Sequence, residues 1–467
     1  MKNPSALTLD RILGLVDEVP AVDRFPTVDA LVAELGRIAL DRPSVARWRR
    51  IGTSRLGEPI HSLTVGRGEH HAVVFGGVHP NEPIGGPTAI HLARTLTADA
   101  ELLDELDYTW HIIGCIDPDG MRLNEGWFGA SLDRGVLGRH FYRPAFNEQV
   151  AWTFPLEYKE LYFDRVLPET LALMRLIDET QPTFMCGLHN GELGGAYYFL
   201  SEEAPALYQL LHAIPDHVGI PLNEGEPELP FIPRYERAIF GDIKVEDQYE
   251  FAVAMGLDPT AGFLDAGSSP DSYARRYGTF SLISELPYWA ASEASNTTPT
   301  NTLYSQVLLD TATSLEDLRL VLSDVLDSVQ SQLRLDTPFL RATRPYVSSL
   351  AQQIAETSHR AELPESRRPA TAAEVFSSAD NIHSVRIRYG GMTRRFLEAE
   401  INAGYARPTI RTQYRRMCQI YDEWAAAANN AMPATTLPIR DLVGLQYGAI
   451  LAAADYAARR GNTSTRR

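Results

Sequence analysis

The sequence predicts an α/β protein with a mixed, mostly parallel central sheet flanked by helices, followed by a mainly helical C-terminal region. Short apolar runs that end in glycine or polar residues alternate with segments of helical spacing through the first 290 residues. Beyond residue 300 helical patterns dominate, most clearly in the amphipathic segment 314–333. We therefore expect three units: a helical N-terminal segment, a catalytic α/β domain and a helical extension, over 1–50, 51–300 and 301–467.

Composition and charge narrow the classes of function. The chain has 467 residues, of which 44% are hydrophobic and 22% charged, as is typical of a globular protein. Its formal net charge of −17 argues against nucleic acid as a partner. Three cysteines give no disulfide framework, and the first twenty residues predict no signal peptide. No apolar run is long enough for a membrane span, so we expect a cytoplasmic protein without a membrane partner.

The first half of the chain contains the expected sheet. Residues 28–40 have helical spacing, and a strand over 60–65 follows the turn at Gly57. The run 72–75 is too short and too apolar for anything but a buried strand, and 85–96 has one apolar helical face. Further strands are expected within 107–120, 182–189, 196–201 and 279–289.

The second half predicts helices joined by polar connectors. Residues 291–304 are expected to form a linker or surface loop, and Ser314 with Asp317 is similar to a capping box at a helix start. For the arginine-containing segment 384–396 we favour a solvated edge strand and helix start over a basic patch. Other helices are expected near 345–360, 409–431 and 438–459, with a connector at 360–371.

Candidate metal ligands follow two of the predicted strands. His79 and Glu82 lie on the loop after the strand at 72–75, and His189 ends the strand at 182–189. Ligands collect at the carboxyl ends of parallel strands, and two histidines with one carboxylate suit zinc, although they also suit other divalent metals. Taken alone, a His-x-x-Glu pair is common by chance, and a hydrogen-bonded or surface histidine is the simpler interpretation.

Four motifs in order give these residues a context. They are RLGEPIHSLTVG (55–66), GGVHPNEPIGG (76–86), IDPDGMRLN (116–124) and GSSPDSYARRYGTFSLISEL (267–286). Together with His189 they resemble the M14 zinc metallocarboxypeptidases of the carboxypeptidase A-like superfamily, as a divergent, bacterial-type member. The resemblance covers about 50–290. One departure is Asp117, which stands where the family usually has asparagine.

The resemblance implies a zinc-dependent amide hydrolase. It implies one zinc ion per chain, held by His79, Glu82 and His189, with Glu285 as the general base and acid. Without the family context, Glu285 would be read as a salt-bridged carboxylate at a strand end. The substrate would be a peptide or an acyl-amino acid, cleaved at or near its carboxyl end.

The substrate-binding residues follow less clearly. The family's Asn-Arg pair is not obvious here, and the resemblance places Tyr142 and Arg143 near that position, with Arg134 between the motifs. We expect Arg143 to anchor the substrate carboxylate and Arg122 to polarise the scissile carbonyl, although each could be a surface arginine. The family's mobile tyrosine corresponds to Phe263, with Tyr197 or Tyr273 as possible replacements, and the specificity position falls near Pro270.

Two other functions stay open. The departure at the arginine pair is compatible with a deacylase of small N-acyl amino acids or metabolites, as in the aspartoacylase-like branch of the superfamily. A binding protein with a non-catalytic zinc site would instead lack a ligand or the glutamate, and the sequence keeps both. The C-terminal helices could cap the cleft, form a homo-oligomer or dock a partner.

Overall fold

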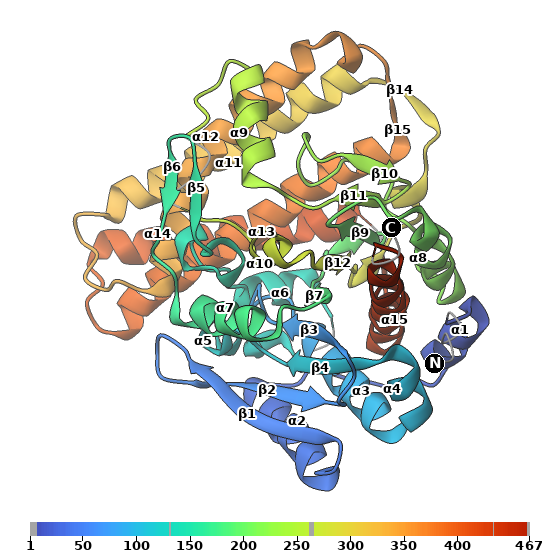
Figure 1. Ribbon diagram of the computed structural model, residues 1–467. Coiled ribbons are helices and arrows are strands. Elements are labelled where there is room, and N and C mark those ends of the chain that lie inside the picture. Colours follow the sequence, from blue (N-terminus) through green and yellow to red (C-terminus); the bar gives the residue numbers. More distant parts are fainter. Residues whose placement is uncertain (1–6, 130–131, 261–265, 433, 465–467) are drawn as a thin grey trace.

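A nine-stranded mixed sheet forms the centre of the computed structural model, which describes residues 7–129, 132–260, 266–432 and 434–464 (Figure 1). The strand order is β1-β2-β4-β3-β7-β12-β9-β11-β10. The bounds are β1 Ala46–Thr53, β2 Pro59–Val65, β3 His70–Gly76, β4 Tyr108–Ile113, β7 Phe184–Leu188, β9 Tyr197–Leu200, β10 Arg234–Glu236, β11 Ile239–Gly241 and β12 Phe280–Glu285.

The strands at the centre of the sheet run parallel. β3 pairs in parallel with β4 and β7, and β7 pairs in parallel with β12, whereas β1, β2 and β9 add antiparallel neighbours. The register sets Gly76 of β3 opposite Leu188 of β7, so both strands end at the same edge. The predicted α/β fold and its helical C-terminal region are confirmed. The candidate metal ligands lie at this edge, after the ends of β3 and β7.

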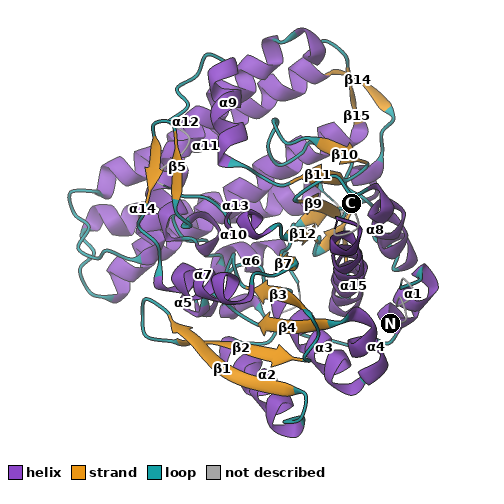
Figure 2. Cartoon of the chain, viewed as in Figure 1, coloured by secondary structure: helices purple, strands orange, loops and turns teal. Residues whose placement is uncertain are grey.

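The two faces of the sheet bury different helices (Figure 2). On β3, Val73 and Phe75 pack with α7, while Ala72 and Val74 belong to the larger core on the other face. This alternation is the two-residue period of a strand buried on both sides. The larger core includes α1 Leu9–Asp17, α2 Val28–Asp41, α3 Gly85–Ala98, α4 Ala100–Leu106 and α8 Pro205–His217; the smaller includes α7 Pro168–Thr180 and α10 Pro270–Ala274.

Short elements complete the first 300 residues. The helices are α5 Pro118–Arg122, α6 Arg134–His140 and α9 Val245–Ala254, and the strands are β5 Leu156–Tyr158, β6 Leu161–Phe163, β8 Leu193–Gly194, β13 Trp289–Ala290 and β14 Pro299–Leu303. The edge strand β1 was not predicted. It begins inside the segment 1–50, which was expected to be helical, and ends at Thr53. Its sequence ARWRRIGT is polar because only Ala46 of the strand is fully buried.

Long helices follow, packed beside the sheet at the end where the metal-ligand candidates lie (Figure 1). They are α11 Tyr304–Val329, α12 Pro338–Glu362, α13 Ala372–Asn402 and α14 Pro408–Ala431. The small strand β15 Pro369–Thr371 precedes α13, and β16 Thr435–Thr436 follows α14. Two expectations were wrong here. The helix predicted at 314 begins at Tyr304, directly after β14 pairs with β15. The segment 384–396 is not a solvated strand but the buried middle of α13.

The last helix returns to the sheet. α15, Ile439–Ser464, packs against α1, α3, α8 and strands β7 and β12, with Leu442, Leu445 and Leu451 fully buried. The C-terminal part of the chain therefore contributes to the same core as the sheet. No helix in the described ranges combines the length and apolar character needed to cross a bilayer.

The contact between α6 and α13 offers a test of this packing. A Cβ on Gly391 would lie 1.9 Å from the Gly138 carbonyl oxygen, a backbone atom that cannot swing away. We expect Gly391→Ala to lower the free energy of unfolding by about 1–3 kcal/mol, the usual range for overpacking. Urea denaturation measures this change. The control is Gly14→Ala in α1, where a Cβ meets nothing within 4 Å and alanine should stabilise the helix by roughly 0.5–1 kcal/mol. Equal stability of both variants would contradict the close helix contact.

Candidate metal centre

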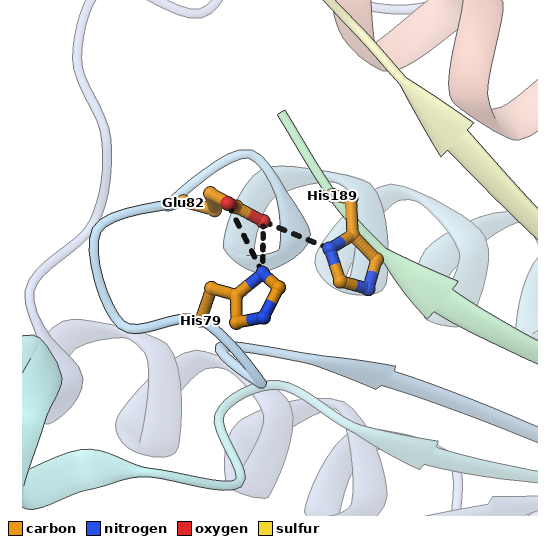
Figure 3. A group of neighbouring side chains, drawn as sticks. All are labelled: His79, Glu82 and His189. Carbon is orange, nitrogen blue, oxygen red and sulfur yellow. Dashed lines mark hydrogen bonds and ion pairs between the residues drawn. The ribbon is translucent and has the colours of Figure 1, made fainter. Parts of the chain in front are cut away.

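Two neighbouring strand ends bring three potential metal ligands together (Figure 3). His79 and Glu82 lie on the loop between β3 and α3, and His189 directly follows β7. Because β3 and β7 are adjacent and parallel, the loop and the strand end meet at one edge of the sheet. Within the described residues this is the one group of three ligand-type side chains whose atoms approach closely enough for a shared metal ion.

The ligand atoms converge on the Glu82 carboxylate. His79 Nδ1 lies 3.2 Å from both carboxylate oxygens, and His189 Nδ1 lies 2.9 Å from Oε2. The two imidazole rings meet edge to face, with centroids 4.8 Å apart. Ligands bound at about 2.1 Å to one tetrahedral zinc ion are roughly 3.4 Å apart. The two histidine–glutamate spacings are therefore close to those of a zinc site, and all the ligand atoms lie within 4.8 Å of one another.

The electrostatics of the group also suit a metal. Burial lowers the pKa of His79 to about 3, and the Arg143 guanidinium acts in the same direction, so this imidazole is neutral at physiological pH. Burial opposes ionisation of Glu82, but His79, Arg143 and the hydrogen bond with His189 outweigh it and hold the Glu82 pKa well below its usual range. Metals bind neutral imidazole and ionised carboxylate, which are the forms favoured here.

A hydrogen-bond network holds the ligand loop and the strand end in place. The Asn190 side chain accepts hydrogen bonds from the Ile84 N–H at 3.2 Å and the Tyr288 hydroxyl at 2.8 Å, and donates to the Leu286 carbonyl. From α15, the buried Gln446 amide donates to the His189 carbonyl at 3.2 Å. Sequence reasoning missed these supports. Asn190 had one signal, its place directly after His189, whereas Gln446 had none.

Glu285 lies beside the ligand group. It is the last residue of β12, the strand next to β7, and its Oε1 is 3.6 Å from His189 Nδ1. Burial, together with the neighbouring Glu228 and Glu82 carboxylates, raises the Glu285 pKa well above its usual value. The structure thus brings together the four residues predicted for metal binding and base chemistry.

A cavity of about 440 Å³ opens in front of this group. His79, Glu82 and Glu285 line one side of it, together with residues 223 and 226–230. Its other wall consists of α11, α12 and α13, which contribute Leu315, Glu356 and Arg388 among other residues. The C-terminal helices therefore enclose the candidate site.

Only one of the predicted substrate arginines lines this cavity among the described residues. Arg143 does so, and its guanidinium is held by the metal-ligand loop through Glu82 and through Asn81 Oδ1 at 3.1 Å. Arg122 is drawn away from the cavity by Asp29, at 2.7 Å, and by Glu58, at 2.9 Å. Arg122 was expected to contact the substrate, but the structure does not place it in the cavity lining, because its guanidinium is paired with these two carboxylates.

The remaining predicted substrate contacts lie mostly in the protein interior. Arg134 is buried behind the cavity wall and donates to Asp380 at 2.6 Å. The Tyr142 ring is buried edge to face against Phe339, and Pro270 is buried at the start of α10. Tyr197 does line the cavity, whereas the Tyr273 hydroxyl donates to Asp178. Phe263 lies outside the described residues.

The comparisons with known proteins agree with this geometry. Residues 31–217 match the family model of the zinc carboxypeptidases. The match contains His79, Glu82 and His189, the three side chains that converge in the structure. This part of the chain is similar to the zinc carboxypeptidase family. No curated protein matches the chain.

Solved structures give weaker likenesses. Carboxypeptidase A from Helicoverpa armigera is 14% identical, with a TM-score of 0.38, and the match covers 76% of this chain and 80% of that one. A metallo-carboxypeptidase from Burkholderia cenocepacia is 17% identical, with a TM-score of 0.33, over 56% of this chain and 60% of that one. The zinc carboxypeptidase assignment therefore depends on the family match, which ends before Glu285 and the helices that wall the cavity.

Proposed function

We propose that the protein is a zinc-dependent hydrolase that cleaves an amide bond at or near the carboxyl end of a peptide or an acyl-amino acid. His79, Glu82 and His189 would hold one zinc ion per chain. The observation that carries the proposal is the convergence of these side chains beside Glu285, at a cavity that His79, Glu82 and Glu285 line. The family match over 31–217 supports the choice of zinc among the metals that such ligands could bind.

The side chains have complementary tasks in amide hydrolysis. Zinc, when bound, supplies Lewis acidity, which activates water and polarises a carbonyl group. Glu285 takes the proton from the attacking water and delivers it to the leaving amine, because amide cleavage requires a protonated leaving group. Arg143 sits against Glu82, where its guanidinium can donate to the oxygen of the scissile carbonyl. We assign no catalytic role to Arg122.

The enclosed cavity favours small substrates and keeps a second candidate function open. Helices α11 to α13 wall a space of about 440 Å³, which suits a ligand of modest size better than a folded protein chain. This observation supports a deacylase of small N-acyl amino acids or metabolites. Both candidates use the same metal, base and cavity, and they differ in the acyl part of the substrate, which is a peptide for the carboxypeptidase and a small acyl group for the deacylase.

A substrate panel tests the proposal. Purified protein reconstituted with zinc is offered N-acyl amino acids and short peptides, each with a free or an amidated terminal carboxylate. We expect hydrolysis of the free acids and at least a tenfold lower kcat/KM for the amides, because a charged hydrogen bond at the carboxylate contributes about 1.5–3 kcal/mol. Equal rates on acids and amides would contradict recognition of the carboxyl end. No hydrolysis of any member, with zinc bound, would contradict the hydrolase.

A further inference from the structure

Two of the arginines that line the cavity lie outside residues 31–217, the segment that matches the family model. Three arginines line the cavity in the part of the chain that the structure describes: Arg143, Arg360 and Arg388. Arg143 is committed to the metal-ligand loop. Arg360 is hydrogen-bonded within the cavity wall, where it donates to Glu226 at 2.9 Å and to the Tyr304 hydroxyl at 2.5 Å. Arg388 is the third arginine of the cavity lining.

Arg388 reaches the cavity from the middle of α13, far outside the family match. Its Nε donates to Glu192 Oε1 at 2.7 Å, and the guanidinium carbon lies 5.6 Å from the centre of the Phe141 ring. Glu192 is only three residues beyond His189, and its carbonyl accepts the N–H groups of Tyr288 and Trp289. Arg388 is therefore fixed to the same loop that follows the third metal ligand.

The geometry leaves part of the Arg388 guanidinium for a ligand. Among the described residues, Arg388 uses its Nε for the hydrogen bond with Glu192, so the two terminal amino groups are the ones that a cavity ligand can meet. The side chain is 24% exposed, whereas its partner Glu192 is only 9% exposed. An arginine oriented by a buried carboxylate presents a planar fork that matches the two oxygens of another carboxylate.

We propose that Arg388 binds a carboxylate of the substrate, so that the C-terminal helices supply a recognition residue to the metal site. The inference rests on the proposed function and names its substrate class, a small amide that carries a free carboxylate. Arg143, held at the ligand loop, then serves the scissile carbonyl rather than the carboxylate. Glu192 positions the Arg388 guanidinium.

Paired variants test this assignment by kinetics. Arg388→Ala should lower kcat/KM for a free-acid substrate by about 100-fold, the cost of truncating one partner of a charged pair. The same variant should change kcat/KM for the amidated substrate by less than about threefold, since the amide makes no charged contact. Arg388→Lys should recover part of the loss. Arg386→Ala is the matched control, because Arg386 lies on the same helix but outside the cavity lining.

A binding measurement gives a readout that does not need turnover. Isothermal titration of the protein with N-benzoylglycine and with its amide should show a preference for the acid, and Arg388→Ala should remove that preference. A purely structural role would weaken both ligands equally, which would overturn the inference, as would a wild-type protein without preference for the acid. If the wild type is active and Arg388→Ala keeps the same kcat/KM and the same preference for the free acid, only this inference is overturned. An inactive wild type that still loses acid preference in the variant would instead overturn the proposed reaction.

Discussion

Replacing His189 by alanine is expected to abolish both metal binding and activity. His189 Nδ1 lies 2.9 Å from the Glu82 carboxylate, and two ligands remain in the variant. Loss of a partner outside the ligand sphere already costs about 10–100-fold in metal affinity, so loss of a ligand should cost more. Elemental mass spectrometry should find one zinc ion per wild-type chain and almost none in the dialysed variant. Hydrolysis should fall below detection in the same samples.

The control for this result is another histidine, His217→Ala. His217 is exposed at the end of α8, where it contacts Asp17 rather than the cavity. This variant should keep its zinc and its activity. Full zinc occupancy in His189→Ala would show that the third ligand is a different residue. If the wild-type protein takes up no zinc on reconstitution, the proposed metal site is wrong.

The edge of the sheet on which the metal centre lies could be predicted from the sequence because each candidate residue lies at or shortly after the end of a short apolar strand. His79 lies on the loop after one short apolar strand, His189 directly follows another, and parallel strands end at the same edge of a sheet. Glu285 ends a third strand beside them. Sequence order alone therefore fixes the side of the sheet on which these residues lie. The resemblance to a known family added their roles.

The substrate-binding side of the cavity could not be predicted in this way. Arg122 was expected there, but Asp29 and Glu58, both distant in sequence, hold it elsewhere. Arg388 was hidden in a segment expected to be a solvated strand, although it belongs to a buried helix. Which arginine faces the cavity depends on how α13 packs against α6 and the loop after β7. No local pattern in the sequence describes that packing.

The edge of the central sheet was also harder to predict from the sequence than its buried middle. The buried strands β3, β4, β7 and β12 stand out as apolar runs, whereas the edge strand β1 is mostly polar and was missed. Residues 438–459 were predicted as a helix, but nothing in their pattern indicates that α15 packs on the sheet or that Gln446 donates to the His189 carbonyl.

Glu285→Gln should lower kcat by about 100- to 10,000-fold, the usual contribution of a positioned general base and acid. Glutamine keeps the size of the side chain but cannot accept a proton from water and return it to the leaving amine. Zinc content should stay at one ion per chain, because Glu285 lies 3.6 Å from His189 Nδ1, beside the ligand group rather than within it. KM should change little, so the kcat loss identifies a defect in the chemical step.

Its control is Glu293→Gln, the same substitution at an exposed glutamate shortly after β13. That variant should match the wild type in zinc content, kcat and KM. If Glu285→Gln hydrolyses the substrate at the wild-type rate, another group must move the proton, and the reaction assigned to this site is wrong. If it loses zinc together with activity, Glu285 supports the metal instead, and its position at the end of β12 serves binding of the ion rather than proton transfer.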